Sequence, residues 1–370
     1  MAYLLASLAG LIASAAFYPA HFWPALPIGI LILIHLNRSD NFKKRIVLNF
    51  LFGISFQIIS LYWVGTYVGS FAWIALVLMQ ATFTILLSFT NGAIAFASAW
   101  VVFEFVLRSF PFGGFGWSRI GYALTESPLN FLYPRLGIVG VAFLVVLTLG
   151  LLLEKRFKTF ITLIPIYLIL SLIPVSVVNT GSIKVGLVQG GQNLKLDNTF
   201  ETAEGAIDKH FLATRKIQTG AVDLVIWPEN AVMHDPLVRK STRERFTAEV
   251  ERIKAPILVN ANLSDGTNGS LIIGDDLNQS YSKRYLTPFG EFIPLRSIVE
   301  KISDKADLVS GYKLGEKPYL FKIGSKTFRT LICYELLSDR QARTEMADVD
   351  FIVVQTNNAT YYQTWQLDQE

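Results

Sequence analysis

The stretch Thr330-Leu331-Ile332-Cys333-Tyr334-Glu335-Leu336-Leu337 places a cysteine at the end of a short apolar run of strand type, with a carboxylate directly after it. Cys333 is the only cysteine in the 370 residues. A single cysteine cannot form a disulfide within its own chain, so it is a nucleophile, an inert thiol or a site of accidental oxidation. The rest of the chain decides among these roles.

The composition of the chain changes near residue 182. Residues 1–182 contain 10 Lys and Arg and 4 Asp and Glu, whereas residues 183–370 contain 23 and 25. The first part consists of long runs of Leu, Ile, Val, Phe and Ala between short charged or turn-like patches, which is typical of membrane helices of about 20 residues. A cleaved signal peptide competes only for the first run, which no basic region precedes. We expect seven membrane helices, over residues 2–18, 22–36, 46–65, 71–89, 92–109, 134–153 and 159–178.

The basic residues of the first part predict the orientation of these helices. One basic cluster, at residues 38 and 43–45, follows two expected crossings, and a second, at residues 155–158, follows six. Both clusters therefore lie on the same side of the bilayer, and the positive-inside rule makes that side cytoplasmic. The seventh crossing brings the rest of the chain to the outer face. We expect a transmembrane helical bundle over residues 1–180 and an extracytoplasmic α/β domain over residues 183–370.

The second part alternates strand-like and helical patterns. Helical patterns occupy residues 201–216 and 242–254, and strand patterns occupy residues 183–188, 224–226, 256–259, 270–273, 319–323, 327–332 and 351–355. About 190 residues are enough to build one core of helices packed on a sheet. This part has no glycine-rich phosphate loop, no His/Cys metal spacing and no basic stripe for nucleic acid. We therefore expect no cofactor, no metal and no nucleic acid partner.

Three expected strand ends carry polar residues. Glu229 follows one strand, Lys283 and Glu291 surround a Pro-Phe-Gly turn, and Cys333 ends a third strand. Each residue alone fits an ordinary solvated charge or a buried thiol. Because strand ends at one edge of an α/β sheet converge, Glu229, Lys283 and Cys333 can meet at one point. Together they supply the base, the cation and the nucleophile that acyl transfer through a cysteine requires.

The motifs around these residues resemble a known family. Trp227-Pro228-Glu229, then Tyr-x-Lys-x-x-Leu-x-Pro-Phe-Gly-Glu over residues 281–291, then Ile332-Cys333-Tyr334-Glu335 follow a multi-helix membrane region. This order resembles the apolipoprotein N-acyltransferases, which are membrane members of the nitrilase-like carbon–nitrogen hydrolase superfamily. The resemblance covers essentially the whole chain, including Val188-Gln189-Gly190 at the start of the second domain. It implies that this domain is a nitrilase-like αββα sandwich.

The resemblance also implies a role for each residue. Glu229 would be the general base, Lys283 would stabilise the oxyanion, and Cys333 would be the nucleophile. The cysteine would take an acyl chain from a membrane phospholipid as a thioester. It would then pass the chain to the N-terminal amine of a diacylglyceryl-cysteine apolipoprotein.

Three further residues receive supporting roles from the same resemblance. Glu291 would support the Lys283–Glu229 pair, and Tyr334 and Glu335 would shape the pocket beside the thiol. The implied protein is a multi-pass protein of the bacterial inner membrane with its catalytic domain on the extracytoplasmic face. The chain has no heptad or interface signature, so we expect a monomer.

Two features depart from the family pattern. Many members of the family carry a tryptophan a few residues after Val-Gln-Gly, near a lid, where this chain has Leu196, so we expect different lid contacts or substrate preference. The chain also stops at Gln369-Glu370, where the family continues with more of the catalytic domain and a last membrane helix. We expect a C-terminally truncated product with an exposed sheet edge.

Two other functions compete with acyl transfer to an amine. A membrane-anchored amidase or nitrilase would use the same Glu-Lys-Cys set and pass the acyl group to water. A non-catalytic membrane scaffold with a degenerate hydrolase-like domain would leave Cys333 with ordinary reactivity. A Cys-His pair is the weaker catalytic alternative, because no comparable setting surrounds the four histidines, His21, His35, His210 and His234.

Overall fold

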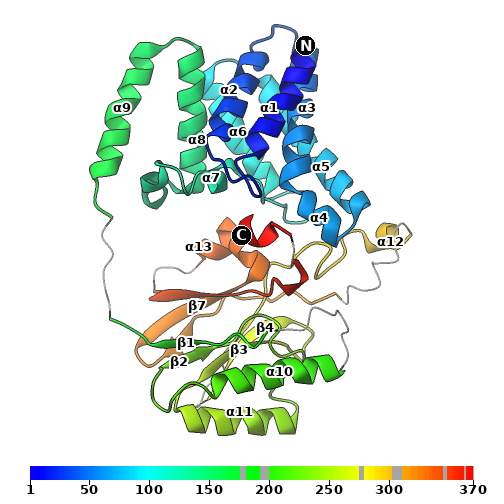
Figure 1. Cartoon of the computed structure of the whole chain (residues 1–370), viewed down its shortest axis with the longest axis vertical. Coiled ribbons are helices and arrows are strands. Elements are labelled where there is room, and N and C mark those ends of the chain that lie inside the picture. Colours follow the sequence, from blue (N-terminus) through cyan, green and yellow to red (C-terminus); the bar gives the residue numbers. More distant parts are fainter. Residues whose placement is uncertain are drawn as a thin grey trace. The chain divides into compact units, whose positions relative to one another are not determined.

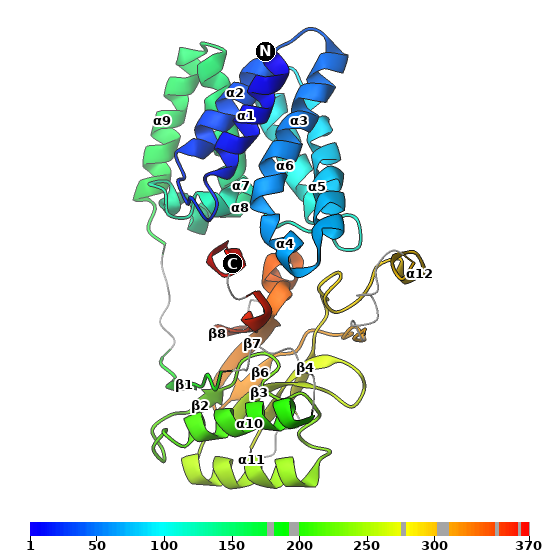
Figure 2. The ribbon, with the colours of Figure 1, turned by 45° about the vertical axis from the view of Figure 1, so that its right-hand side comes forward.

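The computed structural model of the chain describes residues 1–175, 181–191, 200–274, 279–301, 311–344, 348–361 and 364–369. The chain forms two compact units. The first comprises Met1–Val177 and Tyr361–Glu370, and the second comprises Val178–Thr360. The second unit is therefore inserted between two segments of the first. Figures 1 and 2 show helices in the first unit and sheets flanked by helices in the second.

The first unit is helical. Its elements are α1 (Ala2–Ser14), α2 (Ala25–Asn37), α3 (Phe42–Ser60), α4 (Tyr62–Tyr67), α5 (Ser70–Thr84), η1 (Ile85–Phe89), α6 (Ala93–Leu107), α7 (Ile120–Ala123), η2 (Asn130–Leu132), α8 (Tyr133–Leu153), α9 (Phe157–Leu172) and, near the C-terminus, α14 (Gln366–Gln369). The short helix η5 (Ala359–Tyr361) spans the point in the sequence at which the chain returns to this unit. Helices α1 and α3 approach closely at Gly10, where a Cβ atom would lie 2.4 Å from the carbonyl oxygen of Phe52. Large side chains such as Phe56 and Trp100 fill the interior around this contact.

Each of the seven apolar ranges expected from the sequence overlaps one of the longer helices. Within the residues that the structure describes, two helical stretches, Ser70–Phe89 and Asn130–Leu153, are long and apolar enough to cross a membrane. The shorter apolar helices are Ala2–Ser14, Ala25–Leu36, Ala93–Leu107 and Leu163–Leu172. Helix α3 begins before the expected residue 46 because the Asn41 side chain caps it, accepting a hydrogen bond of 3.0 Å from the Lys44 N–H.

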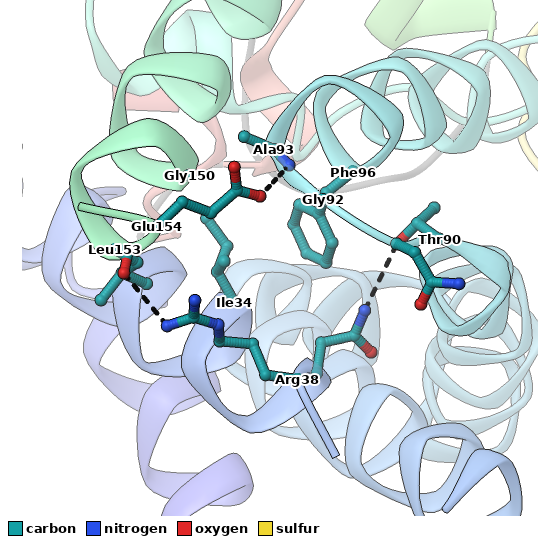
Figure 3. Close-up of a pocket in the computed structure, with 11 residues that line it drawn as sticks. Ile34, Arg38, Thr90, Gly92, Ala93, Phe96, Gly150, Leu153 and Glu154 are labelled. Carbon is teal, nitrogen blue, oxygen red and sulfur yellow. Dashed lines mark hydrogen bonds between the residues drawn. The ribbon is translucent and has the colours of Figure 1, made fainter. Parts of the chain in front are cut away.

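The two basic clusters lie at the same end of this unit. The Arg38 guanidinium, after α2, donates to the carbonyl of Leu153, at the end of α8, at 3.0 Å (Figure 3). Next to it, the Glu154 carboxylate accepts from the Ala93 N–H at 2.6 Å and so caps the start of α6. These side chains help to line a small cavity of about 100 Å³. The α2–α3 and α8–α9 connections are therefore neighbours in space.

The second unit has two sheets stacked face to face. The first contains β1 (Val185–Leu187), β2 (Leu224–Ile226), β3 (Ile257–Asn262), β4 (Asn268–Ile273) and β5 (Ser280–Ser282) in that order. Strands β1 to β3 are parallel, whereas β4 runs antiparallel to both of its neighbours. The second sheet contains β6 (Phe321–Ile323), β7 (Lys326–Ile332) and β8 (Phe351–Gln355), with β7 and β8 parallel.

Helices complete a four-layer αββα arrangement. Helices α10 (Phe200–Thr214) and α11 (Lys240–Ile253) cover the outer face of the first sheet, and α13 (Asp339–Arg343) lies beyond the second (Figures 1 and 2). The short helices α12 (Arg296–Val299) and η4 (Cys333–Leu337) lie in connections. The α/β fold expected for the second half is thus confirmed.

Alternate residues of β2 serve two cores. Val225 packs toward α10 and α11 together with Trp227 and Phe246, whereas Leu224 and Ile226 pack against the second sheet. Successive strand residues point to opposite faces, so a strand with both faces covered is apolar at every position. This explains why residues 224–226 are a short, continuous apolar run.

Two details differ from the sequence-based expectation. Strand β5 was not expected, because Ser280-Tyr281-Ser282 is short and mostly polar. Residues 361–370 belong to the helical unit, although the expected second domain extended to residue 370. Aromatic contacts account for this placement, because Trp365 stacks on Tyr62 with ring centroids 5.4 Å apart. In addition, the Trp117 indole donates to the Gln369 side chain at 2.7 Å.

Candidate active site

Strand directions bring the predicted residues to one region of the second unit. Strand β5 is parallel to β3, because both are antiparallel to β4, so Lys283 after β5 lies near the beginning of β4 at Asn268. The Lys283 N–H donates to the Asn268 carbonyl at 2.8 Å. Glu229 follows β2, which is the parallel neighbour of β3. The Asn268 side-chain amide donates to Glu229 Oε1 at 3.1 Å. The convergence expected from the sequence is therefore present for Glu229 and Lys283.

The Lys283 ammonium lies between two carboxylates. Its nitrogen is 3.3 Å from Glu229 Oε1 and 2.8 Å from Glu291 Oε2. The Lys283 side chain is 1% exposed and that of Glu229 is 5% exposed. Buried charges are stable only when they are paired and hydrogen-bonded, and both conditions are met here. The structure thus brings Glu291 into the same cluster as the two predicted catalytic residues.

Burial and pairing shift the ionisation of this cluster in defined directions. Burial raises the pKa of the Glu229 carboxyl, and the Lys283 ammonium only partly opposes this. Burial alone would lower the pKa of Lys283, but the charges of Glu229, Glu291 and Cys333 outweigh it and raise the pKa. The lysine is therefore a permanent cation at neutral pH. A carboxylate with a raised pKa is the better proton acceptor.

Cys333 occupies a sharp turn between β7 and η4. Its backbone φ is +48°, in the left-handed region that residues other than glycine rarely adopt. Such backbone conformations cost free energy and concentrate at functional sites. The residue is partly buried against the core between the sheets. A negative charge on Cys333 would raise the pKa of Lys283, so the sulfur is within electrostatic range of the ammonium.

The Glu335 carboxylate ties the Cys333 turn to the Lys283 segment. Its Oε2 accepts from the Ile332 N–H at 2.9 Å, immediately before the cysteine. Its Oε1 accepts from the Tyr281 hydroxyl at 2.6 Å and from the Arg284 N–H at 2.7 Å, on either side of the lysine. Glu335 is fully buried. Glu335 therefore holds the end of β7 and the end of β5 together, and we call this arrangement the Glu335 clamp.

The other predicted pocket residue, Tyr334, has an aromatic partner. Its ring stacks on that of Tyr285 with centroids 5.3 Å apart and an interplanar angle of 3°. Tyr334 is buried. The two rings form a flat apolar surface. Tyr334 directly follows Cys333 in the sequence, and Tyr285 lies two residues after Lys283.

The sequence analysis assigns no role to three residues that complete the cluster. Asn268 donates to both glutamates, the Asn357 N–H donates to Glu229 Oε2 at 3.0 Å, and Tyr281 binds Glu335. Asn268 and Tyr281 belong to strands, and Asn357 follows β8. Asparagine at a strand end is too common in turns to indicate a site. Tyr281 is the first residue of the motif over residues 281–291, whereas no pattern in the sequence separates Asn268 and Asn357 from their neighbours.

The histidines of this unit have other partners. His210 Nδ1 lies 2.7 Å from the Ala206 carbonyl within α10, and His234 Nε2 lies 3.0 Å from the hydroxyl of Thr242 on α11. Among the described residues, no group of three or more His, Cys, Asp and Glu side chains is arranged to hold a metal ion. Leu196, where a different lid contact is expected, lies outside the described residues.

Comparisons with known proteins agree with the resemblance found in the motifs. The family model "Apolipoprotein N-acyltransferase N-terminal domain" matches residues 9–151. The apolipoprotein N-acyltransferase of Haemophilus influenzae is 26% identical over 97% of this chain and 77% of its own length. That of Wigglesworthia glossinidia brevipalpis is 27% identical over 94% of this chain and 77% of its own length.

Among solved structures, the chain is similar to a CN-hydrolase superfamily protein from Xanthomonas campestris. The similarity has a TM-score of 0.35 and a sequence identity of 19%, and it covers 47% of this chain and 64% of that protein.

Proposed function

We propose that this chain, which is similar to the apolipoprotein N-acyltransferases, moves an acyl chain from a membrane phospholipid to the N-terminal amine of a diacylglyceryl-cysteine apolipoprotein. The observation that carries the proposal is the buried Glu229–Lys283–Glu291 cluster, held next to the turn that bears the only cysteine. A nucleophile, a raised-pKa carboxylate and a fixed cation are the parts that acyl transfer through a thioester needs.

The first step forms the thioester. Glu229 accepts the thiol proton, and the sulfur of Cys333 attacks the ester carbonyl carbon of the phospholipid. The Lys283 ammonium stabilises the negative oxygen of the tetrahedral intermediate. The carbon–oxygen bond to glycerol then breaks, and the proton on Glu229 passes to the departing glycerol oxygen. A lysophospholipid leaves, and the acyl chain stays on the sulfur.

The second step transfers the acyl chain to nitrogen. The amine of the apolipoprotein attacks the thioester carbonyl, the carbon–sulfur bond breaks, and Glu229 carries the amine proton to the sulfur. The product amide is more stable than the thioester, so this step runs forward. Glu291 keeps Lys283 charged and oriented throughout, because it contributes the shorter of the two contacts to the ammonium.

Glu335 and Tyr334 have supporting roles in this scheme. Glu335 sets the spacing between the Cys333 turn and the lysine, because it accepts hydrogen bonds from both segments. The stacked rings of Tyr334 and Tyr285 offer a flat apolar wall beside the sulfur, suited to an acyl chain.

We further propose that the helical unit crosses the membrane seven times. Neighbouring basic connections at one end of the unit support a common cytoplasmic side (Figure 3). The catalytic domain then faces the opposite side, as a monomer of the bacterial inner membrane. Both substrates are lipids, and at ~0.8 kcal/mol per methylene the extraction of an acyl chain into water is prohibitive. A site tethered at the bilayer surface avoids that step.

The decisive experiment is intact-mass spectrometry of the purified protein after incubation with phospholipid vesicles. We expect a mass increase of one acyl chain in the wild type and none in Cys333→Ala. A diacylglyceryl-cysteine peptide should discharge the adduct and gain the acyl chain. An adduct lost only to water would support the hydrolase instead, and no adduct would support the scaffold.

The orientation can be tested with the same cysteine. A membrane-impermeant maleimide should label Cys333 in right-side-out membrane vesicles and leave it unlabelled in inverted ones. Labelling only in inverted vesicles would reverse the proposed topology. Detergent-solubilised protein is the control. Without a membrane barrier, the maleimide should label Cys333 whichever vesicles the protein came from.

A further inference from the structure

We propose that Asn268, held in one orientation by Asn260, is a positioning residue that keeps Glu229 and Glu291 on Lys283 and keeps Glu229 able to accept the thiol proton. The inference rests on the proposed function of the same site. It concerns two strand residues that no sequence motif identifies. Both asparagines are fully buried.

A backbone group fixes the direction of the two amides. The Asn230 N–H, directly after Glu229, donates to Asn260 Oδ1 at 2.8 Å. A backbone N–H can only donate, so this position of Asn260 must be its oxygen, and its NH₂ group faces the other way. That group donates to Asn268 Oδ1 at 2.8 Å. The NH₂ group of Asn268 is therefore turned toward the glutamates.

Asn268 contacts all three charged residues of the cluster. Its Nδ2 lies 3.1 Å from Glu229 Oε1 and 3.0 Å from Glu291 Oε1, and an amide nitrogen carries two hydrogens, one for each carboxylate. Its backbone carbonyl accepts from the Lys283 N–H at 2.8 Å. One residue at the beginning of β4 thus positions the two carboxylates and the backbone of the lysine.

A neutral donor fits the charge balance of the site. Two carboxylates face one ammonium, so ionisation of both leaves one excess negative charge in a buried volume. A hydrogen bond from an uncharged N–H favours the ionised carboxylate without adding a further charge. The other titratable groups nearby are Tyr312, Cys333 and Glu335. Burial and then the charges of both glutamates raise the pKa of Tyr312, and the charge of Cys333 raises the pKa of Lys283. Burial raises the pKa of Glu335, and the charge of Lys283 opposes this.

The test compares the pH dependence of Cys333 reactivity in Asn268→Leu and wild type. Two rates are measured, thioester formation with phosphatidylethanolamine vesicles and alkylation by iodoacetamide. Without the donor, the acid limb of thioester formation should move up by about one pH unit, with a loss of about tenfold below the limb and recovery above it. Asn268→Ser, which retains a small donor, should shift less. Asn260→Leu, which does not touch either glutamate, should shift in the same direction.

Gln279→Leu is the matched control. Gln279 is a buried amide that bonds both the N–H and the carbonyl of Lys322, and it has no contact with the glutamates in the described structure. Its loss should lower the melting temperature and leave the pH limb in place. If Asn268→Leu folds and lowers the rate equally at every pH, or keeps the wild-type profile, the positioning role is overturned.

Two remaining outcomes are also decisive. If Asn268→Leu shows no cooperative unfolding, the test rests on Asn268→Ser and Asn260→Leu. The inference is overturned if the acid limb of thioester formation is unshifted in both variants. If the wild type forms no thioester with vesicles, the proposed acyl transfer fails. The alkylation profiles then still test the asparagine pair, because a glutamate that holds its charge less well changes the pH at which the Cys333 thiolate forms.

Discussion

The ammonium of Lys283 lies 2.8 Å from the carboxylate of Glu291, and the two side chains are 1% and 12% exposed. Glu229 is the second, longer contact of the same ammonium, at 3.3 Å. The lysine therefore has an effect on the site besides the oxyanion stabilisation proposed for it. It is the only cation between two carboxylates that would otherwise repel each other, within the part of the unit that the structure describes.

Replacement of this lysine should destabilise the second unit. Lys283→Met leaves two buried carboxylates without their cation, and we expect a loss of about 3–5 kcal/mol in the free energy of unfolding. Lys283→Met combined with Glu291→Gln should recover part of that loss, because one of the unpaired charges is removed. Urea unfolding of both variants measures this. A double variant less stable than Lys283→Met would contradict the repulsion argument.

The clamp formed by Glu335 should be sensitive to removal of its charge. Glu335→Gln places an NH₂ group where the carboxylate accepts from N–H and O–H donors, and we expect a loss of about 2 kcal/mol and a large drop in thioester formation. Tyr281→Phe removes only one donor to the carboxylate and should cost about 1 kcal/mol. Thermal unfolding and intact-mass spectrometry of both variants provide the comparison. Equal losses in the two variants would show that the tyrosine alone is responsible.

The turn at Cys333 predicts an unusual order of stability. Glycine adopts a φ of +48° without steric cost, whereas alanine pays about 1–2 kcal/mol. Part of this advantage is offset because glycine gains more entropy on unfolding, so Cys333→Gly should exceed Cys333→Ala in stability by about 0.5–1 kcal/mol. Both variants should be inactive. The melting temperatures measure the difference, and a more stable alanine variant would argue against a strained turn.

The raised pKa of Glu229 predicts a pH profile for the chemical step. Burial of this carboxyl shifts its proton loss above the ordinary value of about 4.3, and only the ionised form accepts the thiol proton. Thioester formation should therefore fall on the acid side at a pH above that of an exposed glutamate. Single-turnover rates across the acidic and neutral range test this. A half-maximal point at or below the ordinary value would remove Glu229 as the base.

His210 should make stability depend on pH. Burial lowers the pKa of its imidazole, so the unfolded chain takes up a proton near pH ~6.5 while the folded chain does not. The neutral His210 imidazole therefore contributes to the free energy of unfolding above this pH, and that contribution is lost as the pH falls. The wild type should therefore lose stability relative to His210→Gln between about pH 7.5 and about pH 5.5. A constant difference in melting temperature would show that the imidazole titrates normally.

Much of the architecture could be predicted from the sequence, because apolar periodicity is a local property. The run Leu224-Val225-Ile226 indicates a strand covered on both faces, and the structure has that strand. The Pro-Phe-Gly turn and the lone cysteine marked the residues around which the cluster forms. Each of these signals is carried by adjacent residues in the chain.

The partners of those residues could not be predicted in the same way. Asn268 reaches Glu229 because β3 and β4 pair with Asn262 opposite Asn268, and that register is set by the whole sheet. Likewise, the stacking of Trp365 on the ring of Tyr62 joins residues that lie far apart in the sequence. Such contacts depend on tertiary packing, which leaves no periodic pattern in the sequence.

The return of the chain to the helical unit at Tyr361 has a consequence for limited proteolysis. A protease that cuts once, where the chain first leaves the helices, yields two fragments. The larger fragment would carry the whole sheet unit and also the residues that bond Trp117 and stack on Tyr62. The fragments should therefore migrate together in native electrophoresis and separate only in denaturant, so that the nicked protein behaves as a complementing pair.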